Sequence, residues 1–308
     1  MRIVFCGTPE FAIPSLEMLL TSPEFSLAGI ISQPDRPRGR GQEVAATPVK
    51  QATAGRAPVF QPEKIQSDEA RAWLEKMAPD AVVIIAYGQI VPQRMLALPR
   101  LGWINLHASL LPKYRGAAPI NRAIANGETA TGLTTMQVDA GMDTGGILLQ
   151  EGITIGATET APELAGRMAE IGAPLVKRTL LELEAGRIIA KPQDSAQASY
   201  APRLRREEGR ITWTRTATEI FNRMRGFAPW PGAYTTFRDR LCHVWGAATE
   251  ETTPAPPGSI LARGASLKVA CGQGTLLRVD SVKLEGGKRI SAQEFASGAH
   301  LRGEEWFK

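Results

Sequence analysis

Short apolar runs alternate with amphipathic stretches along the first half of the chain. Strand patterns cover residues 2–6, 26–32, 81–87 and 103–107, and helical patterns cover residues 9–20, 69–77 and 163–184. The run 81–87, which reads AVVIIAY, is apolar throughout, as expected of a strand covered on both faces. Residues 133–138 and 146–150 are expected to pair around a turn at 139–145. This order of elements predicts an α/β fold with a mostly parallel sheet.

The pattern changes after residue 189. Residues 190–206 are polar and contain two prolines without a clear period, which indicates a linker. A helix is expected at 217–225, followed by short strands at 233–237, 241–247, 258–263, 267–271 and 275–283. Many short strands separated by turns predict a small β-barrel. We therefore expect an α/β domain at 1–189, a linker at 190–206 and a barrel domain at 207–308.

Length and composition agree with a globular protein of two domains. The 308 residues are enough for two separate cores. Three cysteines, Cys6, Cys242 and Cys271, lie far apart without paired spacing, so we expect no disulfide framework and a cytoplasmic location. No apolar run reaches the roughly 18 residues of a membrane span, and the N-terminus reads as a first strand rather than as a signal peptide.

Charge is unevenly distributed between the two halves. Residues 201–308 carry 17 Lys and Arg against 11 Asp and Glu, a net charge of +6, which leaves −1 for residues 1–200 of the total of +5. A basic second half indicates a polyanionic partner such as nucleic acid, although the same charge also serves solubility. A second basic feature is the segment 33–50, which is expected to be a loop and carries Arg36, Arg38 and Arg40 among prolines and glycines. Arginines in such a loop can contact phosphates.

The stretch 103–120, WINLHASLLPKYRGAAPI, carries the candidate chemistry. Alternation along its strand places Asn105 and His107 on the same face, at the end where α/β folds keep their sites. The glycine-rich turn DAGMDTG at 139–145 supplies Asp139 and Asp143 as candidate carboxylates for the imidazole. An amide donor, an imidazole and a carboxylate together suit acyl transfer, with His107 as acid and base and Asn105 as donor to an oxyanion.

Other chemistry finds less support in the sequence. Gly7-Thr8-Pro9 follows the first strand in place of a Gly-x-Gly-x-x-Gly motif, so a nicotinamide cofactor is not expected, and Cys6 is expected to be a core thiol. His107, His243 and His300 lie far apart without metal-ligand spacing, and we expect no metal. Ser109 lacks the Gly-x-Ser-x-Gly elbow of a serine nucleophile.

Taken together, these segments resemble the methionyl-tRNA formyltransferase family of folate-dependent enzymes. The similarity is carried by NLHASLLP at 105–112, YRGAAPI at 114–120, DAGMDTG at 139–145, FCGTPEFA at 5–12, QPDRPRGRG at 33–41 and PWPGAY at 229–234, and it runs nearly end to end. The resemblance implies a Rossmann-like N-terminal domain, a linker and a C-terminal barrel similar to an oligonucleotide-binding (OB) fold. It also implies formyl transfer from 10-formyltetrahydrofolate to the α-amino group of methionine on initiator tRNA, for translation initiation.

The resemblance also assigns roles to residues. Asn105, His107 and Asp143 match the family's catalytic set, and Ser109, Leu110, Leu111 and Pro112 match its folate-binding segment. We expect tRNA contacts from Arg36, Arg38, Arg40, Arg203, Arg205 and Arg206, with Arg223 and Arg225 as further candidates, and we expect the chain to act as a monomer. The alternatives left open are a formyltransferase for an amino sugar nucleotide, a formyltetrahydrofolate hydrolase, and an RNA-binding protein on a decayed enzyme scaffold.

Overall fold

Contacts divide the chain into two units in the computed structural model, which describes residues 1–38, 43–263, 266–301 and 305–308. Unit 1 comprises residues 1–119, 130–154 and 163–202, and unit 2 comprises residues 120–129, 155–162 and 203–308. Unit 2 therefore takes in two short segments from the first half of the chain. The domain limits expected from the sequence, 1–189, 190–206 and 207–308, stay a prediction.

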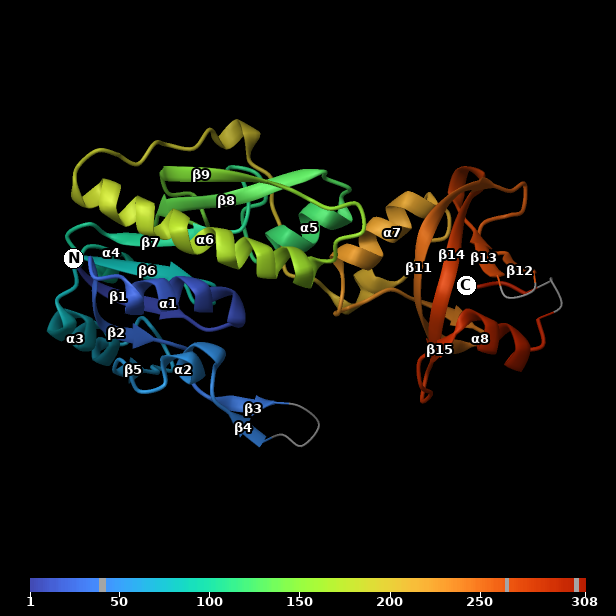
Figure 1. The fold of residues 1–308 in the computed structure, drawn as a ribbon, viewed down its shortest axis with the longest axis horizontal. Coiled ribbons are helices and arrows are strands. Elements are labelled where there is room, and N and C mark those ends of the chain that lie inside the picture. The colour runs from blue at the N-terminus through green and yellow to red at the C-terminus, as the bar shows by residue number, and fades with distance from the viewer. Residues whose placement is uncertain (39–42, 264–265, 302–304) are drawn as a thin grey trace. The chain divides into compact units, whose positions relative to one another are not determined.

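Unit 1 is built on one seven-stranded sheet (Figure 1) with the order β5-β2-β1-β6-β7-β8-β9. The strands are β1 (Arg2–Gly7), β2 (Ser26–Ile31), β5 (Val59–Phe60), β6 (Ala81–Ile85), β7 (Trp103–His107), β8 (Ala130–Gln137) and β9 (Ile147–Thr154). The strands β1, β2, β5, β6 and β7 pair in parallel. Next to β7, β8 pairs antiparallel with it, and β9 pairs antiparallel with β8. The mostly parallel sheet is confirmed. Strand order reverses direction between β1 and β6, the position where open α/β sheets bind ligands.

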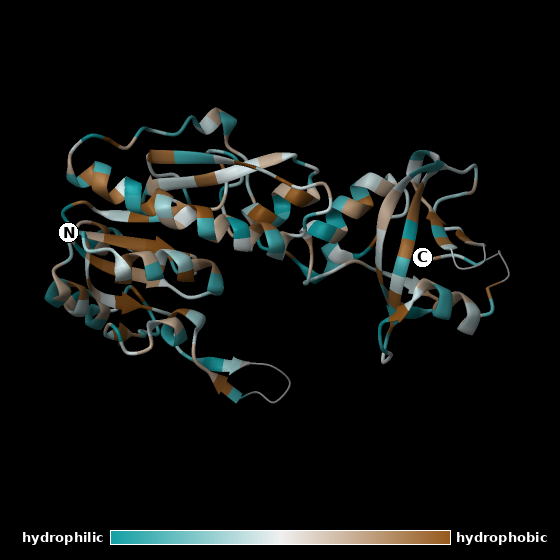
Figure 2. Ribbon diagram, in the orientation of Figure 1, coloured by the Kyte–Doolittle hydropathy of each residue, from teal (hydrophilic) through white to brown (hydrophobic). Residues whose placement is uncertain are grey.

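Helices and buried apolar side chains cover this sheet. The helices of unit 1 are α1 (Ile13–Thr21), α2 (Pro48–Thr53), α3 (Asp68–Met77), α4 (Gln93–Leu96) and α6 (Ala161–Glu184), with short 3-10 turns η1 (Glu10–Ala12) and η2 (Ser195–Gln197), whereas α5 (Pro119–Ala125) belongs almost wholly to unit 2. Every residue of β6 is buried, and Figure 2 shows this strand coloured as hydrophobic. Cys6 is fully buried in the same core, as expected of a structural thiol. No described helix carries an apolar stretch long enough to cross a membrane.

The segment 33–50 corrects an expectation from the sequence. It was expected to be a loop, but it contains the antiparallel pair β3 (Arg36–Arg38) and β4 (Glu43–Ala45) and the first turn of α2. These two three-residue strands do not alternate between apolar and polar residues, because they have no buried face: Arg36 and Val44 are both exposed. Asp35 at the base of this hairpin pairs with Lys50 at 2.5 Å. Arg40 lies outside the described residues.

Unit 2 contains an antiparallel sheet with the order β10-β11-β14-β13-β12 and β15 beside β14. Its elements are η3 (Arg206–Gly209), α7 (Ala217–Gly226), β10 (Tyr234–Phe237), β11 (Arg240–Thr252), β12 (Ile260–Arg263), β13 (Ser266–Ala270), η4 (Gly272–Gly274), β14 (Thr275–Leu284), β15 (Ile290–Ser291) and α8 (Ala292–Gly298). Cys242 and Val244 on β11 point into its core, while His243 between them is only partly buried. The small antiparallel barrel predicted from the short strands is confirmed.

The last residues of the chain close this barrel. Lys308 exchanges two backbone hydrogen bonds with Thr236 on β10, and Phe307 donates to the carbonyl of Gly258 at 3.0 Å, just before β12. The tail thus pairs with both edge strands, which would otherwise expose unpaired backbone groups. The Phe307 ring stacks on Trp213 inside the barrel, with 5.7 Å between ring centroids.

Candidate active site

The predicted polar pair lies at the end of β7, beside the position where the strand order reverses. Asn105 pairs in register with Ile84 of β6 on one side and with Met136 of β8 on the other. Two positions along an extended strand bring His107 to the same face, at the last residue of β7. The strand therefore carries both side chains to the carboxyl-end edge of the sheet, as the sequence predicted.

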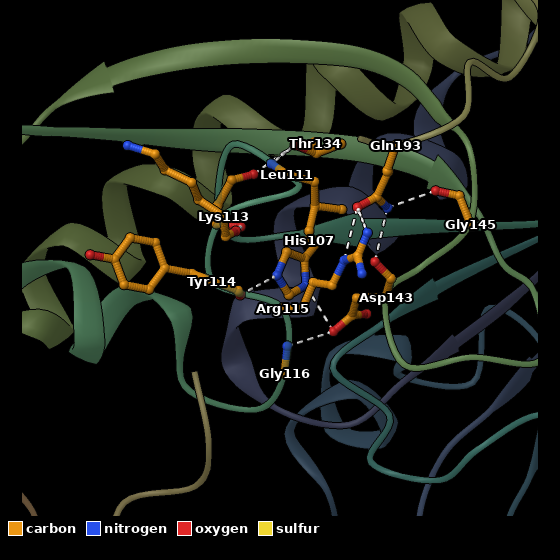
Figure 3. Close-up of polar contacts among 11 residues, drawn as sticks. His107, Leu111, Lys113, Tyr114, Arg115, Gly116, Thr134, Asp143, Gly145 and Gln193 are labelled. Carbon is orange, nitrogen blue, oxygen red and sulfur yellow. Dashed lines mark hydrogen bonds and ion pairs between the residues drawn. The ribbon is translucent and has the colours of Figure 1, made fainter. Parts of the chain in front are cut away.

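An oxygen atom lies beside each ring nitrogen of His107, as Figure 3 shows. Its Nε2 lies 2.9 Å from the carbonyl oxygen of Tyr114, and its Nδ1 lies 3.6 Å from Oδ2 of Asp143. A carbonyl oxygen can only accept, so Nε2 must carry a hydrogen in this arrangement. Only 6 % of His107 is exposed, and the ring is therefore fixed in orientation. Nδ1, the ring nitrogen that faces Asp143, is therefore the one that can gain or lose a proton.

Asp143 reaches the imidazole from a strained turn. Its backbone has a positive φ of 53°, and its Oδ2 also accepts a hydrogen bond of 2.8 Å from the backbone N–H of Gly116. Gly116 itself has a φ of 116°, and a Cβ there would lie 2.9 Å from the carbonyl oxygen of Ala201. Only glycine fits this gap, so Gly116 determines how closely the loop after β7 approaches Asp143.

A buried arginine ties the same two loops together. Arg115, only 3 % exposed, donates from Nε and Nη2 to the side-chain oxygen of Gln193 at 3.0 and 2.7 Å. The amide of Gln193 then donates to the carbonyl oxygens of Asp143 and Gly145 at 2.9 and 2.7 Å. Figure 3 shows this chain of contacts beside the imidazole. The turn that carries Asp143 is thus held from both its side chain and its backbone.

The segment expected to bind folate is tightly organised by its own hydrogen bonds. The Ser109 hydroxyl, fully buried, donates to the carbonyl of Lys113 at 2.6 Å, and the Leu111–Pro112 peptide bond is cis. Thr134 Oγ1 donates to the Ser109 carbonyl and accepts from the backbone N–H of Leu111. The Ser109 hydroxyl is therefore engaged in holding its own loop. Folate binding by Ser109, Leu110, Leu111 and Pro112 stays a prediction.

Asn105 differs from its neighbours in having a free side chain. Its amide makes no hydrogen bond to any residue in the described part of the chain, and the residue is only partly buried. Its two N–H donors are therefore available to a ligand oxygen at the same edge as His107. An unengaged amide beside a held imidazole can stabilise negative charge that develops on a carbonyl oxygen.

The basic residues expected to contact RNA fall into different settings. The exposed ones are Arg36, Arg203, Arg205 and Arg206. For Arg38, the structure describes only its position in β3. Arg225, a further candidate, is a correction: it is 6 % exposed and donates to the carbonyls of Gly156 and Glu159 within unit 2. Arg223 is half-buried and lies over the Phe227 ring at 4.8 Å. Burial of these guanidinium groups lowers the pKa of each from its ordinary value.

Sequence reasoning missed the residues that hold the site in place. Arg115 lies inside the stretch 103–120, but nothing in its spacing distinguishes it from a surface charge. Gln193 and Ser199 lie in the segment expected to be a linker, and Ser199 Oγ accepts a 2.9 Å bond from the backbone N–H of Tyr114. These contacts join positions far apart in sequence, and a polar segment without a period gives no signal for them.

Comparison with known proteins identifies related chains. Residues 1–180 match the model of the formyl transferase family, and residues 203–300 match that of the formyl transferase C-terminal domain. The methionyl-tRNA formyltransferase of Acidobacterium capsulatum is 50% identical over 307 residues, which cover 99% of this chain and 98% of that protein. The enzyme of the same name from Solibacter usitatus is 50% identical over 303 residues, 98% of this chain and 96% of that protein.

Solved structures share the fold at lower identity. An N-formyltransferase from Helicobacter canadensis, solved with folinic acid and dTDP-3-aminofucose, aligns with a TM-score of 0.68 and 20% identity over 91% of this chain and 98% of that one. Methionyl-tRNA formyltransferase from Clostridium thermocellum aligns with a TM-score of 0.56 and 16% identity over 82% of this chain and 94% of that one. At these identities the likeness supports the fold alone.

Proposed function

The chain belongs to the formyl transferase family and, within it, to the methionyl-tRNA formyltransferases, and on this basis we propose the reaction that it performs. It transfers a formyl group from 10-formyltetrahydrofolate to the α-amino group of methionine on initiator tRNA. One observation in the structure carries the chemistry: the free amide of Asn105 lies on the same strand face as His107, whose ring is held by Tyr114 and Asp143. This is the donor, imidazole and carboxylate set that acyl transfer requires.

In the proposed mechanism, the uncharged α-amine attacks the formyl carbon and a new C–N bond forms. Negative charge gathers on the formyl oxygen, and Asn105 donates a hydrogen bond to it. The amine nitrogen loses a proton, and the departing folate nitrogen gains one as its bond to the formyl carbon breaks. His107 moves this proton through Nδ1, because Nε2 remains bonded to the Tyr114 carbonyl. Asp143, 3.6 Å from Nδ1, stabilises the charged imidazole while it holds the proton.

Exposed arginines supply the contacts with tRNA in this proposal. Arg203, Arg205 and Arg206 follow one another closely where unit 2 resumes, and the net charge of residues 201–308 is +6. The exposed Arg36 at the base of the hairpin, with Arg38 and Arg40 after it, provides a second group of cations. Guanidinium groups bind phosphate oxygens in a forked geometry and release counterions from the RNA.

Formyl transfer assayed with three acceptors tests the proposal. The purified protein is given 10-formyltetrahydrofolate with initiator Met-tRNA, elongator Met-tRNA or a dTDP-linked amino sugar, and folate consumption without acceptor is measured as a control. We expect rapid formylation of initiator Met-tRNA, weaker use of the elongator and no sugar product. Consumption of folate without transfer would instead identify a hydrolase, and a formylated sugar would identify the small-amine enzyme.

A further inference from the structure

The outer face of the barrel carries aromatic rings in a row. Tyr234 on β10 pairs in register with His243 on β11, and their ring centroids lie 5.9 Å apart. Trp245, two positions further along β11, follows at 6.1 Å from His243. All three alternate with the buried Thr235, Cys242 and Val244, so they face away from the core and are only partly covered. In Figure 1, β11 and β14 run side by side in the barrel, and the strand order places β10 on the other side of β11.

Cations accompany these rings. Arg289 lies over the Trp245 ring at 4.2 Å from its centroid, and Lys283 on β14 pairs in register with His243. At the other end, the backbone carbonyl of Arg206 accepts a hydrogen bond from the Tyr234 hydroxyl. None of the three cations forms an ion pair within the described residues, whereas Asp280, on the same strand as Lys283, is bonded to Arg278. The face therefore combines aromatic rings with positive charge that has no carboxylate partner.

A β-bulge produces this arrangement. Trp245 pairs with Ser281 and Gly246 pairs with Val279, so Asp280 is an extra residue on β14. The bulge places Ser281 and Lys283 beside Trp245 and His243, and Ser281 accepts a 2.7 Å bond from Arg289 Nε. Gly246 permits it, because a Cβ there would lie 2.0 Å from the Arg278 carbonyl oxygen. Bulges often redirect side chains in this way at binding sites.

Two rings of this face, Trp245 and His243, lack within the described residues the hydrogen bonds that structural aromatic residues make. The indole N–H groups of the buried Trp103 and Trp213 donate to Met95 and to Thr235. In contrast, neither the Trp245 indole nor the His243 imidazole has a hydrogen-bond partner in the described part of the chain. Burial lowers the pKa of His243, and the charges of Lys283 and Arg206 lower it further, which favours the neutral ring. Neutral flat rings with free polar edges suit stacking by nucleobases.

We infer that Tyr234, His243, Trp245 and Arg289 form a stacking platform for unpaired nucleotides of the RNA substrate, with Lys283 and Arg206 beside the phosphates. This inference rests on the proposed function for the identity of the RNA. The centroid spacings of 5.9 and 6.1 Å exceed the roughly 3.4 Å rise of a stacked strand, so the platform fits bases that have separated from one another. Aromatic rings and arginine planes both accept stacked bases, and neighbouring cations bind the backbone.

Equilibrium binding of two single-stranded probes tests this platform in the full chain. The probes are a ten-nucleotide oligoadenylate and the same backbone with abasic sites, measured against wild type, Trp245→Ala, Trp245→Phe and Trp306→Ala. Trp306 is an exposed tryptophan of unit 2 that lies outside the platform. We expect wild type to bind the probe with bases more tightly than the abasic probe. Trp245→Ala should reduce that preference by roughly 5- to 150-fold, the usual contribution of one stacked base, and Trp245→Phe and Trp306→Ala should keep it.

The enzyme assay gives a second readout. Trp245→Ala should raise KM for Met-tRNA by the same factor with kcat and folate affinity unchanged, provided that thermal unfolding shows a folded protein. If Trp245→Ala binds both probes as wild type does, or if Trp306→Ala lowers binding equally, the platform is wrong. Failure of the proposed function would look different: the wild-type protein itself would transfer no formyl group to Met-tRNA, whatever the binding of the probes shows.

Discussion

Two polar residues of β7, Asn105 and His107, have different surroundings, which suit them to the different tasks that we propose for them. His107 is 6 % exposed and has an acceptor at each ring nitrogen, so its orientation is determined before any substrate binds. Asn105 makes no hydrogen bond within the described residues and keeps its donors for a ligand. A preorganised imidazole beside an unengaged amide lowers the cost of reaching a charged transition state, since neither group must reorganise.

Replacing Asn105 with alanine tests its role as oxyanion donor. Asn105→Ala should lower kcat by roughly 10²–10³-fold, the usual cost of removing one such donor, while the melting temperature changes little because no internal bond is lost. Formyl transfer to initiator Met-tRNA and thermal unfolding are measured on the same sample. Ser109→Ala serves as the contrasting variant, because its buried hydroxyl bonds the Lys113 carbonyl and its loss should lower stability. Near-normal turnover in Asn105→Ala would exclude the assignment.

At the scale of elements, the site depends on loops that the strands bring together. The turn with Asp143, the loop after β7 and the segment with Gln193 meet through Arg115, whose guanidinium is buried. A buried guanidinium needs its acceptors, because leaving such a charge unsatisfied is costly. The positions of Asp143 and His107 thus depend on a glutamine far along the chain.

Loss of Gln193 should disturb catalysis and stability together. Gln193→Leu removes the acceptor of Arg115 and both donors to the Asp143 turn, so we expect a loss of about 2 kcal/mol in the free energy of unfolding and a lower kcat. Denaturant titration and the formylation assay measure the two effects. Gln197→Leu is the matched control, since Gln197 is exposed and bonds only the neighbouring Asp194. Equal behaviour of the two variants would show that the contact through Gln193 does not position the turn.

Glu208 gives unit 2 a pH-dependent contact. Arg122 on α5 donates two hydrogen bonds to the Glu208 carboxylate in η3, and these bonds hold the pKa of Glu208 below its ordinary value. Because the pKa is lowered on folding, the stabilisation is complete above roughly pH 4.3, the unfolded value, and is lost as pH falls through the lower folded value. The stability difference between wild type and Glu208→Ala should therefore shrink as pH falls from about 5 toward 3. Denaturant titrations across that range measure it, with the exposed Glu207→Ala as control; a difference that stays constant would contradict the prediction.

The elements that sequence could predict are those with a local signal. The apolar run of β6 and the exact span of β7 follow from side-chain alternation, and the same alternation brought Asn105 and His107 together. The hairpin of β3 and β4 was missed, because its pairing leaves no apolar face. Gln193 was missed for a related reason: its role depends on contacts with residues distant in sequence, and no periodic pattern marks such contacts.

At the scale of the whole molecule, two units with different architectures share the work that we propose. Unit 1 carries the proposed catalytic set at the end of β7 in a mostly parallel sheet, and unit 2 carries the barrel and the excess of positive charge, since residues 201–308 have a net charge of +6. Both units draw on separated stretches of the chain, so neither is a continuous piece of sequence. The barrel in addition depends on the C-terminal residues, which pair with its two edge strands.

The stability of unit 2 should therefore depend on Phe307 far more than on its neighbour. Phe307 is 3 % exposed and contacts the rings of Trp213 and Phe237, so Phe307→Ala should cost about 3–5 kcal/mol of unfolding free energy. Trp306, 46 % exposed, points outward from the same tail, and Trp306→Ala should change stability by about 0.5 kcal/mol or less. Denaturant unfolding followed by tryptophan fluorescence compares them, and formyl transfer at low temperature shows whether the catalytic set survives. If both variants instead lose only a little unfolding free energy, the backbone pairing of the tail, rather than its buried ring, holds the barrel closed.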